Sequence, residues 1–245
     1  MTMNAGNHDK NYIVLIWLFV CVVAVACGLN TVHGFLVQPV IKRKNKFAKT
    51  TFRTGDLLLW STSFKWYTDV QKIACASRFT HVGLVFVDRQ GIPFLWESTT
   101  KNGQQMTRLD NVFETYINNH ATCVLRKINF PLDSVAFESF VMANIGKGYS
   151  FRLWDGVVNR WLHRMHLPQL HYGKHKQQPP PDRFCSQLVA DTYQHLNVIR
   201  LELSDKNNSQ LVLPSDFSVN GQAENPHALF WVTPYALGPE IKLTL

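Results

Sequence analysis

The chain has few charged residues and few cysteines for its length. Only 17% of its 245 residues are charged and 46% are hydrophobic, so it is too apolar to be disordered and long enough to bury one sizeable core. Its 5 cysteines include no CxxC pair, and three of them lie beyond residue 50. An odd and scattered set of this kind argues against a disulfide framework and a cysteine-ligated zinc site, and it is typical of a reducing compartment.

The main part of the chain also lacks a large excess of positive charge. The formal net charge is +8, but residues 1–50 hold six Lys and Arg against one Asp, whereas residues 51–245 hold nineteen against sixteen acidic residues. The second part has no basic stripe interleaved with aromatic residues, which argues against nucleic-acid binding. The excess is concentrated in one cluster, made of Lys42, Arg43, Lys44, Lys46 and Lys49.

A long uncharged run precedes this basic cluster. Residues 12–29 are eighteen positions without a charged side chain, the short end of what a membrane-spanning helix needs. Basic residues beside such a helix favour the cytoplasmic side and are attracted to anionic headgroups. The sequence therefore predicts a single-pass membrane protein whose main domain is cytoplasmic and lies at a membrane surface. The alternative is a cleaved signal peptide with Ala24-Val25-Ala26 as its processing site, or a lipid-modified Cys27.

Four regions follow from these patterns. We expect an N-terminal tail over 1–11, a transmembrane anchor over 12–29, a basic juxtamembrane linker over 30–50 and one globular domain over 51–245. Within the domain, alternating and helical periodicity predict an α+β fold, a small antiparallel sheet packed against helices. The expected strands are 57–60, 81–87, 93–97, 122–128 and a closing strand near 230–232. The expected helices are 65–77, 110–118, 133–145 with Asp133 as its cap, 151–164 and 185–196.

Cys185 stands at the start of the last of these helices. Asp182 precedes it by three residues and is the expected N-cap, so Cys185 falls in the first turn. There the unpaired backbone N–H groups and the positive end of the helix dipole favour a thiolate, and the same groups could bind an oxyanion. The alternative is a structural role, because a cysteine beside Phe184 and Leu188 is often a small buried hydrophobe.

His81 opens an apolar strand about a hundred residues earlier. A thiolate and an imidazole are the two groups that a nucleophilic hydrolase or acyltransferase needs. Glu97 ends the returning strand, where its carboxylate could orient His81 and stabilise an imidazolium, as in a catalytic triad. A hydrogen-bonded structural histidine and a solvent-facing glutamate are the alternatives. Asp56 or Asp216 would be the next candidate for the orienting carboxylate.

Five sequence blocks occur in the order typical of one known family. Over about residues 51–220 the chain resembles the circularly permuted papain-like amidases of the NlpC-type superfamily, in the YaeF/YiiX-like group. The histidine block precedes the cysteine block, which is the reverse of the usual papain order. The blocks are Gly55-Asp56-Leu57-Leu58-Leu59, Thr80-His81-Val82-Gly83-Leu84-Val85, Leu95-Trp96-Glu97-Ser98, Gly148-Tyr149-Ser150-Phe151 and Phe184-Cys185-Ser186-Gln187-Leu188-Val189.

The resemblance implies a role for each matching residue. Cys185 would be the nucleophile, His81 the base and then the acid, and Glu97 the group that orients His81. A Tyr-containing block recurs before the cysteine in the family, so Tyr149 would line the pocket or assist the oxyanion site. Ser186 and Gln187 would also lie at the substrate. The family often has a glutamate where this chain has Gln187, so any acidic role there is lost. A covalent acyl-enzyme of this kind needs no metal and no cofactor.

The resulting hypothesis is a membrane-anchored cysteine hydrolase or acyltransferase that acts on an amide, peptide or lipid acyl bond. The related lecithin retinol acyltransferase-like group works on lipids, and an anchor with a basic patch favours a lipid substrate. A cleaved N-terminus would favour peptide amides instead. The alternative from another class is a catalytically inactive papain-like fold that binds a lipid or protein partner at a membrane. The oligomeric state stays open.

A histidine-rich loop is the feature that this hypothesis does not use. It contains His163, His166, His171 and His175 and is followed by a run of prolines. These histidines have no partner cysteines or carboxylates at ligand spacing, so we expect no metal site there. We interpret residues 163–175 as part of a mobile loop that leads toward Cys185.

Overall fold

The computed structural model of the chain describes residues 50–61, 72, 78–118, 121–150, 182–201, 209, 212–224 and 229–243. Apart from Thr50 and Lys72, the expected tail, anchor and linker, the helices 65–77 and 151–164 and the histidine-rich loop lie outside these residues. They stay predictions. Within the described ranges, no helix combines the length and the apolar character that a membrane crossing requires.

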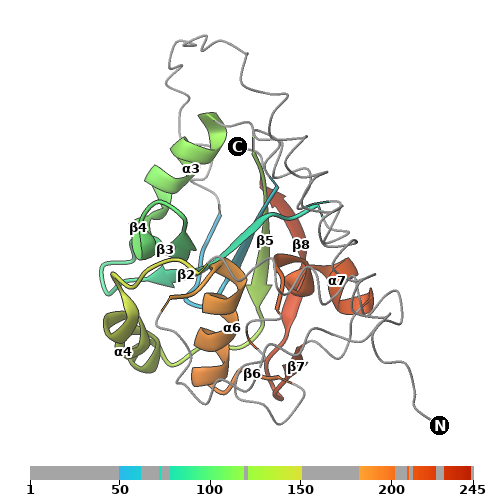
Figure 1. Cartoon of the computed structure of the whole chain (residues 1–245). Helices are drawn as coiled ribbons and strands as arrows, with labels where there is room; N and C mark the ends of the chain where they lie inside the picture. The colour runs from blue at the N-terminus through green and yellow to red at the C-terminus, as the bar shows by residue number, and fades with distance from the viewer. Residues whose placement is uncertain are drawn as a thin grey trace, which may run out of the picture. The chain divides into compact units, whose positions relative to one another are not determined.

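The core is a six-stranded antiparallel sheet in the order β4-β3-β2-β1-β5-β8 (Figure 1). Its strands are β1 (Leu57–Ser61), β2 (His81–Val87), β3 (Pro93–Thr99), β4 (Gly103–Arg108), β5 (Thr122–Ile128) and β8 (Leu237–Leu243). The helices that the described residues form are α3 (Leu109–Asn118), α4 (Ser134–Asn144), α6 (Cys185–His195) and α7 (Val219–Glu224), with a 3-10 turn η3 (Pro214–Phe217). The predicted α+β class with an antiparallel sheet is thereby confirmed.

β1 is buried on both faces, which explains its continuous apolar sequence. Leu57 and Leu59 belong to a large core together with side chains of α4 and α6. Leu58 and Trp60 belong to a second core, which includes side chains of α3. Since successive strand residues point to opposite faces, the sheet carries helices on both sides. Figure 1 shows α4 and α6 beside each other on one of them.

α4 begins and ends where its sequence predicts. The Asp133 carboxylate accepts hydrogen bonds from the backbone N–H groups of Val135 and Ala136, at 2.9 and 3.0 Å. Just past the helix, Gly146 adopts a left-handed φ of 83°, as glycine does at helix ends. Its N–H donates to the carbonyl of Gln104 on β4 over 2.9 Å. The turn after α4 is therefore held against an edge strand of the sheet.

The two edges of the sheet differ from the sequence prediction. The expected closing strand near 230–232 is β7 (Phe230–Trp231), which pairs with β6 (Ile199–Arg200) in a separate two-stranded sheet. β8 closes the main sheet instead, and Gly238 and Pro239 weaken its strand pattern. Proline is tolerated there because an edge strand needs hydrogen bonds on one side alone. β4, at the other edge, was not predicted because its sequence is polar.

Candidate active site

Cys185 is the first residue of α6, where the sequence placed it. The N-cap, however, is Phe184, so the prediction that Asp182 caps the helix is wrong. The Asp182 carboxylate accepts a hydrogen bond from the backbone N–H of Gly148 instead, at 3.0 Å. A Cβ at Gly148 would lie 2.7 Å from this carboxylate, so glycine is what permits the close approach. No side chain among the described residues caps α6. The unpaired N–H groups of its first turn, which carry the partial positive charge of the helix N-terminus, therefore lie beside Cys185.

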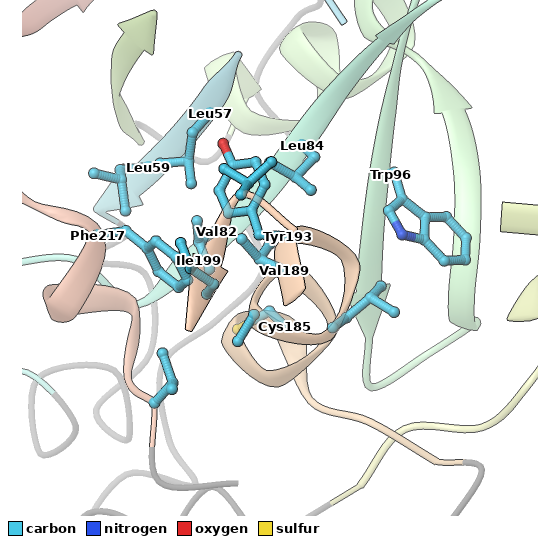
Figure 2. Close-up of a cluster of buried hydrophobic side chains, with 14 of the residues drawn as sticks. Leu57, Leu59, Val82, Leu84, Trp96, Cys185, Val189, Tyr193, Ile199 and Phe217 are labelled. Carbon is cyan, nitrogen blue, oxygen red and sulfur yellow. The ribbon is translucent and has the colours of Figure 1, made fainter. Parts of the chain in front are cut away.

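Contacts on both sides hold the segment that leads into α6. The Ser98 hydroxyl on β3 donates to the carbonyl of Arg183 over 2.5 Å. The Arg183 guanidinium donates to the Asn144 side chain of α4 at 2.9 Å and to the carboxylate of Asp191 on α6. Cys185 therefore starts its helix at a point tied to both β3 and α4. Figure 2 shows its side chain on the ribbon of α6 among the apolar residues of the large core.

His81 is the first residue of β2 and lies opposite Trp60 of β1. Its Nε2 is 2.7 Å from Oε2 of Glu97, and the two side chains are 14% and 4% exposed. A carboxylate accepts hydrogen bonds and does not donate them, so Nε2 carries a proton. Nδ1 is then the ring nitrogen left for Cys185.

The charge state of His81 depends on both neighbours. Burial is the largest single influence, and it lowers the pKa of the imidazole. The charge and the hydrogen bond of Cys185 act in the opposite direction, as do the hydrogen bond and the charge of Glu97. The pKa of His81 is thereby raised from 6.5 to about 10. His81 therefore keeps its proton at neutral pH. The structure thus brings together the thiol, the imidazole and the carboxylate that the sequence singled out.

Gln105 is a neighbour that sequence reasoning missed. It lies on β4 as the register partner of Glu97 on β3. Its Nε2 donates to Oε1 of Glu97 over 3.0 Å, so each oxygen of this carboxylate has a partner on an adjacent strand. Because β4 was not recognised from its sequence, no local pattern pointed to Gln105.

Tyr116 is a second neighbour without a predicted role. Its ring stacks on Trp60, with centroids 4.1 Å apart and planes 13° from parallel. It also lies nearly parallel to the His81 ring, at a centroid distance of 6.2 Å and an angle of 24°. Burial raises the pKa of Tyr116 well above 10, and the charges of Glu97 and Cys185 add to this shift. α3 therefore supplies an aromatic wall beside the imidazole.

The two alternative carboxylates bind backbone groups. Buried Asp56 accepts from the N–H groups of Arg53 and Ile128 at 2.9 and 3.1 Å, and burial raises its pKa. Asp216 accepts from the N–H of Leu213 at 2.8 Å, at the start of η3. Each thus ties a turn to its surroundings. Of the three carboxylates, Glu97 is the one whose hydrogen bond to His81 is observed.

The residues predicted to bind substrate lie in three different settings. The Ser186 hydroxyl is buried and donates to the carbonyl of Val212 over 2.7 Å. Gln187 is 1% exposed, and its buried Nε2 has no hydrogen-bond partner among the described residues. Tyr149 is half-buried in the loop after α4. Gln187, two residues after Cys185, is therefore the one with an unused buried donor.

The side chains assembled here are a thiol, an imidazole and a carboxylate, which are the three kinds of group that acyl transfer uses. A metal centre is a separate question. In the described part of the chain, no three His, Cys, Asp or Glu side chains are grouped so as to hold a metal ion. The histidine-rich loop lies outside that part, and the expectation for it stays a prediction.

Comparison with known proteins finds matches among solved structures. No family model matches the chain, and no curated protein matches it. The crystal structure of metalloprotein yiiX from Escherichia coli O157:H7 matches with a TM-score of 0.45 and 14% sequence identity. The match covers 80% of this chain and 98% of that one. The likeness to YiiX expected from the sequence is thus confirmed as a structural match at low identity, and the chemistry of this chain is inferred from its own residues.

Proposed function

We propose that the chain is a cysteine hydrolase or acyltransferase in which Cys185, His81 and Glu97 form the catalytic triad. One observation carries the proposal. The His81 imidazole, which is 14% exposed, interacts on one side with Glu97, at 2.7 Å, and on the other with the Cys185 sulfur, and these contacts raise its pKa to about 10. In the proposed resting state Cys185 is a thiolate and His81 is an imidazolium oriented by the Glu97 carboxylate, which is the ion pair that nucleophilic thiol catalysis needs.

The first half-reaction follows from these positions. The Cys185 sulfur attacks the acyl carbonyl, a C–S bond forms, and the carbonyl oxygen becomes an oxyanion. The first-turn N–H groups of α6 lie at the same helix end and would stabilise this oxyanion. His81 then gives its proton to the departing amine or alcohol as the C–N or C–O bond breaks. An acyl-enzyme on Cys185 and a neutral imidazole remain.

The second half-reaction reverses these roles. The neutral His81 imidazole removes a proton from water, or from the hydroxyl or amine of an acceptor, which attacks the thioester carbonyl. The C–S bond breaks, and the Cys185 thiolate and the protonated imidazole are restored. Hydrolysis and acyl transfer differ solely in the group that attacks.

We further propose that the substrate is an amide, peptide or lipid acyl bond presented at a membrane surface. The uncharged run 12–29 and the basic cluster after it support a single-pass anchor with the domain on the cytoplasmic side. Cations near an anionic surface contribute about 1 kcal/mol each. This location favours a lipid or lipidated substrate. A cleaved N-terminus would favour peptide amides.

Trapping the acyl-enzyme tests the triad directly. The full-length chain in detergent is mixed with p-nitrophenyl octanoate, quenched with acid and measured by intact mass and peptide mapping. We expect one octanoyl group, on Cys185, and none in Cys185→Ala or His81→Ala. Cys123→Ala is the matched control, because this thiol is equally buried and has an apolar setting. A wild-type chain without an adduct, or with one at another residue, would contradict the proposal.

One observation favours a second function, a catalytically inactive papain-like module that binds a lipid or protein partner at a membrane. Cys185 is 1% exposed, so in this conformation its thiol is not open to a large substrate. Alkylation separates the two functions. A module predicts slow reaction of Cys185 with iodoacetamide that rises only near the free thiol value of about 8.5, with or without His81. The enzyme predicts fast reaction at neutral pH that His81→Ala removes.

A further inference from the structure

We propose that Gln105 is a positioning residue, whose side-chain amide holds the Glu97 carboxylate with one oxygen directed at His81. The inference rests on the proposed function and deepens it. Three neighbouring strands, β2, β3 and β4, each contribute one member of a hydrogen-bonded series. His81 binds one oxygen of Glu97 at 2.7 Å and Gln105 binds the other at 3.0 Å.

The carboxylate needs such a second partner. Glu97 is 3% exposed, and a buried carboxylate is stable only when its oxygens are hydrogen-bonded. The last torsion of a glutamate side chain has broad minima, so a carboxylate bound through one oxygen can rotate. The Gln105 amide removes this freedom because it binds the oxygen that His81 does not use. Nε2 must face the carboxylate, since the amide oxygen is an acceptor as well.

The neighbouring glutamine shows that the contact is specific to position 105. Gln104 points to the other face of β4, and its Nε2 lies 3.4 Å from the carbonyl of Gly148. Its backbone N–H donates to the carbonyl of Lys147 over 2.7 Å. Gln104 thus ties the edge strand to the turn after α4, whereas Gln105 contacts a side chain of the triad.

The test compares Gln105→Met with Gln90→Met in the full-length chain. Methionine has a similar length and no donor, and Gln90 is exposed in the turn after β2. We expect alkylation of Cys185 by iodoacetamide at pH 7 to slow about fivefold in Gln105→Met, the scale of one lost hydrogen bond. Gln90→Met should match the wild type. An unchanged rate in Gln105→Met would overturn the proposal, and Gln105→Thr provides a second variant should methionine unfold the edge strand.

The Glu97→Gln variant, which lacks the Glu97 charge, distinguishes a positioning role of Gln105 from a general structural role. If Gln105 acts through Glu97, Gln105→Met should cause no further slowing when added to Glu97→Gln. An equal slowing in both backgrounds would mean that Gln105 supports the sheet in general, and the proposal would fail.

Titration of the His81 imidazole by NMR needs no substrate and no reactive thiol. Glu97, Cys185 and Tyr116 face this ring. We expect its titration to move to lower pH in Gln105→Met, in the same direction as in Glu97→Gln and by less. An unchanged or upward titration would overturn the inference. If Cys185 forms no acyl adduct but the titration moves as expected, the proposed function fails and the positioning role stands.

Discussion

Cys185 and Cys123 are buried to the same extent, with 1% and 0% exposure, yet their surroundings differ. Cys123 lies within β5 opposite Trp60, in the core that includes α3. Burial raises the pKa of its thiol well above 9, so it stays protonated. Cys185 begins a helix and contacts the protonated imidazole of His81.

The difference shows that burial by itself does not decide whether a cysteine is reactive. A thiol in a strand has its backbone N–H engaged in the ladder and only apolar side chains around it, so it behaves as a small hydrophobe. A thiol in the first turn of a helix lies beside N–H groups that the helix does not use. A positive neighbour then adds to the same effect. The three predictions below test this contrast.

The largest effect is expected from removing each thiol. Cys185→Ala should lower the turnover of an acyl substrate by about a thousandfold or more, as the loss of a nucleophile does. Cys123→Ala should keep turnover and lower the free energy of unfolding by about 1 kcal/mol, the scale of a small deletion in a core. Steady-state kinetics and urea unfolding measure both. Equal turnover in the two variants would mean that the contrast between the thiols has no catalytic meaning.

The second prediction concerns the charge that holds the proton on His81. The pKa of His81 is raised to about 10, so the protonated ring, which in the proposed mechanism gives a proton to the leaving group, is lost as pH rises through that value. Glu97→Gln removes one of the two negative neighbours and should therefore move the alkaline limb of kcat/KM to lower pH. Any stability that this proton contributes is present below 6.5 and disappears toward about pH 10.

Glu138→Gln is the control for this change. Glu138 is exposed on α4, and its ion-pair partner among the described residues is Arg89, at 3.9 Å. Its pH profile should match the wild type. An alkaline limb that stays in place in Glu97→Gln would show that Glu97 does not orient the catalytic imidazole.

Local patterns predicted the parts of the fold that local chemistry decides. The strand 81–87 has the predicted bounds, and Asp133 caps α4 as expected. Asp182 looked like an equally good cap, but a backbone N–H thirty-four positions away in the sequence takes its carboxylate. The edge strands β4 and β8 were missed because their pairing partners, and not their own apolar patterns, make them strands.

The same distinction applies to the candidate site. Cys185 and His81 were selected from their positions at the start of a helix and of a strand, and the structure places them there. Gln105 reaches Glu97 through the register of two strands, and Tyr116 reaches His81 through the packing of α3 on the sheet. Neither register nor packing can be read from a short stretch of sequence. The roles of all four residues stay predictions.

The smallest effect is expected at Tyr116, whose surroundings include the side chains of both cysteines. If its ring serves to hold the imidazole in place, Tyr116→Leu should lower kcat/KM about threefold, and the lost stacking should reduce stability by about 1 kcal/mol. Tyr116→Phe keeps the ring and should retain nearly full activity. Cys123 should stay unreactive to iodoacetamide in both variants, because leucine and phenylalanine each keep an apolar side chain against the core that contains this thiol. If Tyr116→Phe were as impaired as Tyr116→Leu, the hydroxyl and not the aromatic wall would be the functional group, and α3 would contribute to the chemistry itself.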